Sequence, residues 1–164
     1  MTTDAKYPNG IKAEMDAHNM RVAKSLFDPF FEQFEITFKK GQTPIYDVDE
    51  HEKILRSKLK AQRNEEQDAE DADKNEIADW YSSKLKEVAE AADKLRDDLK
   101  ARQITQRQLA LKTLTDRPIE EQSKYTLFNH WIKGKEDIHG RYIKTIAEQL
   151  ETTTDKILLH HIAG

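Results

Sequence analysis

The sequence predicts an all-α protein, because of its composition and its hydrophobic periodicity. Charged residues make up 35% of the 164 residues and hydrophobic residues 37%, with only 5 glycines and 4 prolines. This composition is typical of helix-rich proteins with small cores. Apolar residues also recur at the spacing of amphipathic helices. We expect an N-terminal helical region over residues 1–46, a long charged helix with a coiled-coil-like seam over residues 47–101, and a four- or five-helix domain over residues 102–164.

The N-terminal region is predicted to contain two helices and most of the phenylalanines. One helical face consists of Ile11, Met15, Val22 and Leu26. Asp28 and Pro29 are expected to end that helix and to start another, because proline is favoured at a first helical position. Five of the six phenylalanines lie within residues 27–38. So many phenylalanines would cause aggregation if exposed, so the cluster indicates a local core, a homodimer interface that includes Phe30 and Phe34, or a peptide or ligand pocket.

The middle of the chain is predicted to form a long charged helix. Asp49 and Glu52 match a capping box, and no glycine or proline follows before Arg102. Apolar side chains then recur at spacings of four and three, which is a heptad seam; they are Tyr81, Leu85, Val88, Ala92, Leu95 and Leu99. The seam can pack against the N-terminal helices or against a second chain. We favour dimerisation through Tyr81, Leu85, Val88, Leu95 and Leu99, since little else is available to cover them.

Residues 63–76 interrupt the apolar pattern that Leu55 and Leu59 begin, and almost all of them are polar. Charge runs of this kind usually form solvated surface. The stretch is therefore either a solvated part of one helix or a break between two helices. We expect no specific acidic function for it.

Residues 104–158 have a pattern of several short helices. Thr105 and Gln108 form a capping box for the first of them. Thr126 is expected to cap the second, which ends at Gly134 because glycine suits the left-handed position after a helix. Apolar residues at helical spacing predict a further helix and a last turn; they are Tyr142, Ile143, Ile146, Ala147 and Leu150, then Ile157 and Leu158 after a capping Thr153 or Thr154.

This order of helices resembles the DNA-binding domain of the lambda-repressor and Cro (XRE-type) family of helix-turn-helix proteins. The resemblance is carried by the stretches ITQRQLALKTL, YTLFNHWIKGK, RYIKTIAEQL and TTDKIL. It implies that residues 125–133 form the recognition helix and that Trp131 packs inward. The connection over residues 115–124 is longer than the family's turn of three to four residues. Pro118 prevents simple continuation of the preceding helix, so we expect a short extra helix over residues 118–122.

The resemblance also implies which side chains meet DNA. Those in the first turns of the recognition helix are expected to contact bases: Tyr125, Thr126, Asn129 and His130. Others are expected to contact phosphates: Gln106, Arg107, Lys124, Lys133 and Lys135. Asparagine fits N6 and N7 of adenine, whereas phosphate contacts position a protein without reading sequence.

The function implied is that of a sequence-specific, double-stranded-DNA-binding transcriptional regulator. It would be repressor-like, of a phage or plasmid type, and act as a homodimer in the bacterial cytoplasm or nucleoid. Residues 1–98 hold 16 Lys and Arg against 23 Asp and Glu, and residues 99–164 hold 11 against 8. Such asymmetry is typical of a binding module on an acidic arm, although ordinary surface variation also produces it. The alternative is a helical adaptor that binds a protein partner through the phenylalanine cluster of its N-terminal region or through the heptad seam, and whose C-terminal bundle only resembles the family.

Missing residues and motifs exclude several other classes. The chain has no cysteine, which excludes disulfides, thiol catalysis and cysteine zinc sites. It lacks the phosphate-loop, dinucleotide, nucleophile-elbow and zinc-protease motifs. The adjacent His160 and His161 lack the spacing of a shared metal site. No apolar run approaches the roughly 18 residues that span a bilayer, and the N-terminus does not resemble a signal peptide. We expect a cytoplasmic protein that is not an enzyme, with no cofactor, metal or membrane partner.

Overall fold

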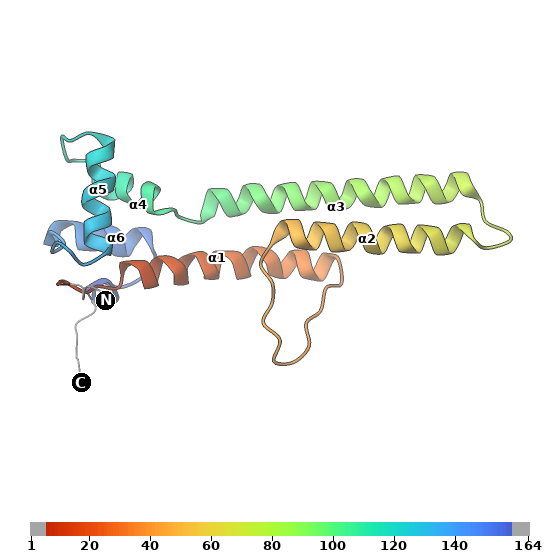
Figure 1. The fold of residues 1–164 in the computed structure, drawn as a ribbon, viewed down its shortest axis with the longest axis horizontal. Coiled ribbons are helices and arrows are strands. Elements are labelled where there is room, and N and C mark those ends of the chain that lie inside the picture. Colours follow the sequence, from red (N-terminus) through yellow and green to blue (C-terminus); the bar gives the residue numbers. More distant parts are fainter. Residues whose placement is uncertain (1–5, 159–164) are drawn as a thin grey trace, which may run out of the picture. The chain divides into compact units, whose positions relative to one another are not determined.

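The computed structural model describes residues 6–158, which form seven helices and no strand. The helices are α1 Ile11–Gln33, α2 Val48–Gln67, α3 Lys74–Arg102, α4 Gln106–Thr113, α5 Glu121–Ile132, α6 Gly140–Gln149 and α7 Thr154–Leu158 (Figure 1). The predicted all-α fold is confirmed. His160 and His161 lie outside the described residues.

The chain divides into two compact units, which are described separately below. The split unit consists of residues 6–22 and 102–158, and the hairpin unit consists of residues 23–101. The division falls after residue 22, within α1, and after residue 101, near the end of α3. The start of α1 therefore shares a unit with residues that follow it by more than 80 positions.

The helix α1 runs through Pro29 without ending, so the predicted break at Asp28 and Pro29 is wrong. An interior proline removes one hydrogen bond and costs about 3 kcal/mol. Phe27, Phe30 and Phe31 lie on both sides of it and are all buried in one core. Burying each such side chain contributes about 1.5–3 kcal/mol, so the packing of the continuous helix outweighs the cost of the proline.

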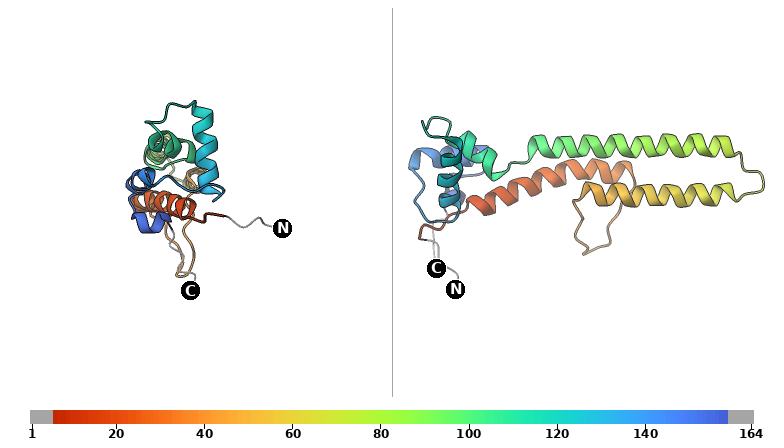
Figure 2. Two further views of the ribbon diagram at one scale, coloured as in Figure 1. Left: turned by 90° about the vertical axis from the view of Figure 1, so that its left-hand side faces the viewer. Right: turned by 45° about the horizontal axis from the view of Figure 1, so that its top comes forward.

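The core of the split unit combines the first part of α1 with the four short helices that Figure 2 shows beside it. Its fully buried side chains include Ile11, Leu109, Phe128 and Trp131. The remaining buried members are Met15, Ile104, Ala110, Leu114, Ile138, Tyr142, Ile146, Ala147, Leu150 and Ile157. The expected core residues of the C-terminal helices are thus largely buried, and α1 supplies two that were not expected there.

Polar side chains of α1 bind the backbone of the split unit at two further points. The Asn19 amide donates to the Ile104 carbonyl at 2.9 Å, and its side-chain oxygen accepts from the Ile104 N–H at 2.8 Å. The Arg21 guanidinium donates to the Leu150 carbonyl at 3.1 Å. These bonds satisfy backbone groups at the end of a helix or between helices, where helical partners are missing.

The predicted helix caps are partly confirmed. Thr105 accepts from the Gln108 N–H, and the Gln108 side chain accepts from the Thr105 N–H, which is the expected capping box of α4. Thr153 accepts from the Lys156 N–H and precedes α7. The cap of α2 is Asp47, which accepts from the Glu50 N–H, so the capping box predicted at Asp49 and Glu52 is wrong.

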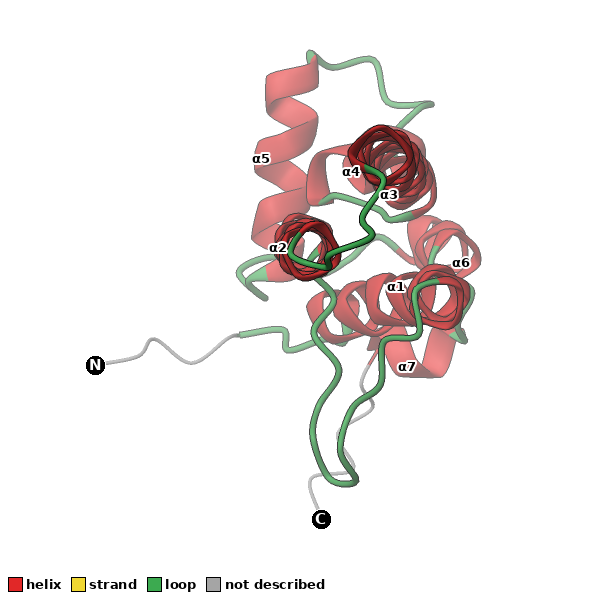
Figure 3. Cartoon of the chain, turned by 90° about the vertical axis from the view of Figure 1, so that its right-hand side faces the viewer, coloured by secondary structure: helices red, strands yellow, loops and turns green. Residues whose placement is uncertain are grey.

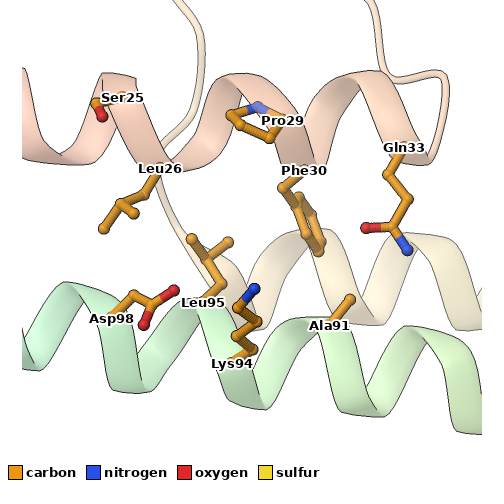
Figure 4. A pocket seen from close by; sticks show the side chains of 9 residues that line it. All are labelled: Ser25, Leu26, Pro29, Phe30, Gln33, Ala91, Lys94, Leu95 and Asp98. Atoms are coloured by element: carbon orange, nitrogen blue, oxygen red, sulfur yellow. The ribbon is translucent and has the colours of Figure 1, made fainter.

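The core of the hairpin unit forms where the second part of α1 packs with α2 and α3. Phe27 is fully buried, and its ring lies 5.4 Å from that of Phe31. The other buried members are Ala23, Phe30, Val48, Leu55, Val88, Ala92 and Leu95. In Figure 4, Leu26 and Phe30 of α1 face Leu95 and Ala91 of α3 across a groove of about 220 Å³.

This packing buries most of the proposed dimer seam within the chain itself. Val88, Leu95 and Phe30 are at most 5% exposed. Tyr81, Leu85, Leu99 and Phe34 are half-buried, and Leu99 and Phe34 pack against the same core. Of the two arrangements that the sequence left open, the structure shows the one in which the seam packs against the N-terminal helix. Val88, Leu95 and Phe30 cannot reach a second chain unless this core opens, so their predicted part in a dimer interface is corrected.

Ionic contacts and a turn complete the hairpin unit. Arg96 of α3 donates to Asp49 and Glu52 of α2, which hold its pKa above the ordinary value. Residues 68–73 separate α2 from α3 (Figure 3), so the single long helix expected over residues 47–101 is wrong and the polar stretch contains a break between two helices. Asp73 starts α3, because its carboxylate accepts from the N–H groups of Asn75 and Glu76 at 3.1 Å.

Candidate nucleic-acid interface

The helix α5 is longer than the sequence predicts and starts in a different way. It spans Glu121–Ile132, and residues 114–120 form the connection from α4 without a helix of their own. The expected short helix over residues 118–122 is therefore wrong. Thr126 is not an N-cap but lies inside α5, where its hydroxyl donates to the Gln122 carbonyl at 3.0 Å. Helix formers such as Glu121, Gln122 and Lys124 allow the helix to begin soon after Pro118.

The inner face of α5 fixes this helix in the core of the split unit. Phe128 and Trp131 are fully buried, and the Trp131 ring lies 5.5 Å from that of Tyr142. The prediction that Trp131 packs inward is confirmed. The inward position of two aromatic residues, three apart, determines which other side chains of α5 face outward.

Four polar side chains form the outer face of α5: Gln122, Thr126, Asn129 and Lys133. They follow one another at spacings of four, three and four, so they lie on one side of a helix. Gln122, Thr126 and Lys133 are exposed, and Asn129 is half-buried. The sequence-based prediction missed Gln122 because it began the recognition helix at Tyr125. The only signal for it was the run of good helix formers after Pro118.

The start of α4 contacts α5 through two pairs of side chains, at the outer face and at its edge. The Gln106 amide donates to the Asn129 side-chain oxygen at 3.2 Å. The Arg107 guanidinium lies 5.0 Å from the centre of the Tyr125 ring, a cation–π contact. Two predicted phosphate-contacting residues are thus paired with two predicted base-contacting residues. We call the start of α4 and the outer face of α5, taken together, the α4–α5 surface.

Two of the predicted base-contacting residues lie at the edges of the α4–α5 surface. Tyr125 is half-buried and packs against the core. The His130 imidazole is half-buried, and its Nδ1 lies 3.5 Å from a carboxylate oxygen of Glu136. Both side chains are therefore partly engaged within the chain, as Asn129 also is, and Thr126 is the exposed member of the four predicted base-contacting residues.

The C-terminal end of α5 is closed by a glycine motif. Gly134 has a φ of +68°, its N–H donates to the Trp131 carbonyl, and the Lys135 N–H donates to the His130 carbonyl. This pattern is the Schellman motif, and it confirms the left-handed position expected for Gly134. The motif places Lys133 and Lys135 on either side of Gly134, where both are exposed.

Residues before α1 bind the same end of α5. The Tyr7 N–H donates to the Gly134 carbonyl at 2.8 Å. The Asn9 amide donates to the Trp131 carbonyl at 2.6 Å, and the Asn9 side-chain oxygen accepts from the Ile11 N–H at 3.1 Å. One asparagine therefore joins the beginning of α1 to the last turn of α5, next to Lys133 in the sequence.

The cations of the α4–α5 surface are not neutralised by neighbouring acids. Within residues 6–158, Arg107, Lys133 and Lys135 take part in no ion pair, so their charges are available to a partner. Lys124 takes part in none either, but it precedes Phe128 by four residues and so lies on the inner side of α5, outside the α4–α5 surface. Lys124 is half-buried and the other three are exposed. The two chain segments of the split unit (residues 1–22 and 102–164) contain 13 Lys and Arg against 11 Asp and Glu. The local arrangement of charge is thus more favourable to an anion than the total charge suggests.

The described residues offer no sign of a membrane span or a metal centre. No helix within residues 6–158 is long and apolar enough to cross a membrane. No group of three or more His, Asp or Glu side chains in that range could hold a metal ion. In comparisons with known proteins, no family model, no curated protein and no solved structure matches the chain.

Proposed function

We propose that the split unit binds double-stranded DNA in a sequence-specific way through the α4–α5 surface. The observation that carries this proposal is the outer face of α5, where Gln122, Thr126, Asn129 and Lys133 point away from a core fixed by Phe128 and Trp131. A helix of this kind fits the major groove of DNA, in which polar side chains contact base edges. The resemblance of residues 104–158 to the lambda-repressor and Cro family supports the same assignment.

The parts of the α4–α5 surface would have different roles. Gln122, Thr126 and Asn129 would contact bases, with Tyr125 and His130 at the edges of the contact. Gln106 and Arg107 lie in the first turn of α4, where free N–H groups and the helix dipole favour an anion such as a phosphate. Lys133 and Lys135 would add further phosphate contacts. The Gln106–Asn129 hydrogen bond would keep the base-contacting amide in a fixed orientation.

The proposed biological role is that of a repressor-like transcriptional regulator in the bacterial cytoplasm. Readers of this type commonly bind two half-sites as dimers, so we also propose that the protein acts as a homodimer. The adaptor alternative is less well supported, because it relies on the phenylalanine cluster and the heptad seam. Most of these side chains are buried or half-buried in the core of the hairpin unit rather than displayed to a partner.

Salt dependence of binding to random-sequence duplex tests the proposal. Each neutralised phosphate contributes a slope of about −0.9 to the plot of log affinity against log salt. The three cations Arg107, Lys133 and Lys135 predict a slope of about −3 for one split unit. A triple change of Arg107, Lys133 and Lys135 to alanine should remove most of it, whereas Lys156→Ala on α7 should not. A chain whose affinity for duplex is undetectable or independent of salt would contradict the proposal.

A further inference from the structure

The outer part of the α2–α3 hairpin has no third helix against it within the hairpin unit. The helix α1 ends at Gln33, whereas α2 and α3 continue side by side to the turn at residues 68–73 (Figure 1). The buried core ends at Leu55 of α2 and Val88 of α3, and no residue from 56 to 87 is buried. Half-buried apolar side chains nevertheless continue along this part, namely Leu59, Ile77, Trp80, Tyr81 and Leu85.

A groove begins where α1 ends. It has a volume of about 570 Å³, and Leu55 and Leu59 of α2 and Trp80 and Val88 of α3 line its apolar part. Lys58 and Lys84 also line it, one from each helix of the hairpin. The groove therefore occupies the place that a third helix would take if α1 were longer. Glu35 and Glu87 line it as well, and Lys84 is paired with Glu87 at 3.4 Å, so the lining suits an amphipathic helix that carries charges of both signs.

The charges of the hairpin are divided along its length. Residues 53–63 contain five Lys and Arg and no acid, whereas residues 64–79 contain eight Asp and Glu and a single lysine. None of these eight acids takes part in an ion pair within the described chain, and Lys53, Lys58 and Lys60 take part in none either. The basic section (residues 53–63) and the acidic section (residues 64–79) could thus neutralise each other. They follow one another along the same hairpin, so within one chain they cannot lie side by side.

We propose that a second copy of the chain occupies this groove, with the two hairpins antiparallel about a two-fold axis. The acidic turn of one hairpin would then lie along the basic section of the other, and the reverse contact would follow from the symmetry. The axis would pass near Gln62 and Trp80, between the two charged sections. A second copy fits this groove because the hairpin surface carries a basic section, an acidic section and a row of half-buried apolar side chains. Each of these features on one chain can therefore meet its complement on the other. This interface would use the half-buried part of the heptad seam, Tyr81 and Leu85, whereas Val88 and Leu95 stay buried in the hairpin core. It does not depend on DNA binding by the split unit.

Charge reversal in two matched variants tests the antiparallel arrangement. The first variant carries Lys58→Glu with Lys84→Glu, and the second carries Glu65→Lys with Glu76→Lys. In each variant both symmetric contacts become repulsive, so sedimentation should show at least a tenfold weaker self-association than wild type. An equimolar mixture of the two should recover a 1:1 dimer, because every contact between different variants is again attractive. Lys53→Glu with Lys60→Glu, on the opposite side of α2, should weaken self-association much less than the first variant.

Three outcomes would overturn the proposal. The first is a wild-type chain that stays monomeric at tens of micromolar in low salt. The second is a control variant that weakens association as much as the first variant does. The third is a pair of folded variants that do not associate when they are mixed.

A single introduced cysteine gives a second measurement that does not disturb the charges, since the chain has no cysteine of its own. Gln62→Cys should give a disulfide-linked dimer under mild oxidation and Lys53→Cys should not; equal cross-linking of both would contradict the antiparallel arrangement. None of these changes alters the split unit, so failure here would leave the proposed DNA binding to be judged separately.

Discussion

Asn129 is the residue on which the proposed DNA recognition depends most. It lies in the middle of the outer face of α5, and Gln106 of α4 donates a hydrogen bond to it. One lone pair of its side-chain oxygen is therefore occupied and the other remains for a second donor, while the amide N–H₂ group has no partner within the described chain. A fixed amide with free donors suits a base edge, because little rotamer freedom remains to be lost on binding.

Asn129→Ala should lower the affinity for a specific site by about 1–3 kcal/mol and relax the preference at one base pair. The free energy of unfolding should change by no more than about 0.5 kcal/mol, since the side chain is not part of the core. Competition binding against single-base variants of the preferred site measures both effects. Unchanged base preference in a variant that binds with full affinity would remove Asn129 from the recognition surface.

Lys133→Ala is the matched change for a phosphate contact. It should weaken binding to all duplexes equally and reduce the salt slope by about one unit, because one neutralised phosphate is lost. The same titrations repeated at several salt concentrations show this effect. A loss confined to one sequence would instead mean that Lys133 contacts a base.

At the scale of the elements, the end of α5 is fixed by backbone geometry rather than by side-chain size. Gly134 adopts a φ of +68° and closes the Schellman motif, to which the Tyr7 N–H adds a hydrogen bond. This position was predictable, because a glycine that follows an apolar helical pattern marks such an end. The start of α5 was not predictable in the same way. Glu120 precedes the helix without a side-chain cap, so no residue type marks the boundary.

Gly134→Ala should lower the free energy of unfolding by about 1–2 kcal/mol, because an alanine is strained in the left-handed conformation. Gly140→Ala is the control for glycine replacement itself. Gly140 begins α6, and an added Cβ would meet no atom within 4 Å, so stability should stay the same or rise by up to about 1 kcal/mol. Urea denaturation of both variants gives the comparison. Equal effects of the two changes would show that the conformation of Gly134 does not limit stability.

At the scale of the whole molecule, the split unit is interrupted in the sequence by the hairpin unit. The sequence pattern showed the amphipathic faces of α1 and of α4 to α7, but it did not show that α1 belongs with the later helices. Ile11 and Met15 share a core with Trp131 and Ile157, and such distant pairings leave no periodic signal. The phenylalanine cluster was equally ambiguous, since core and interface require the same residue types.

The structure predicts that residues 23–101 can be replaced by a flexible linker of six Gly and Ser residues. Such a linker spans about 13 Å, and the Asn19–Ile104 hydrogen bonds keep the two ends of the split unit together. The shortened chain should fold cooperatively, as measured by circular dichroism. A fragment that starts at residue 101 should not, because it lacks Ile11 and Met15 and exposes the core that they cover. Equal stability of the two fragments would show that α1 is dispensable.

Selection of bound sequences from a random duplex pool tests the central claim most directly, namely that α5 reads DNA. The wild-type chain should enrich a defined motif, arranged as an inverted repeat if two chains bind together. A variant with Gln122, Thr126 and Asn129 all changed to alanine keeps the core and the lysines, so it should still bind duplex but enrich no such motif. Failure of the wild-type chain to enrich any sequence, or enrichment of the same motif by the triple variant, would contradict the assignment of α5 as the recognition helix.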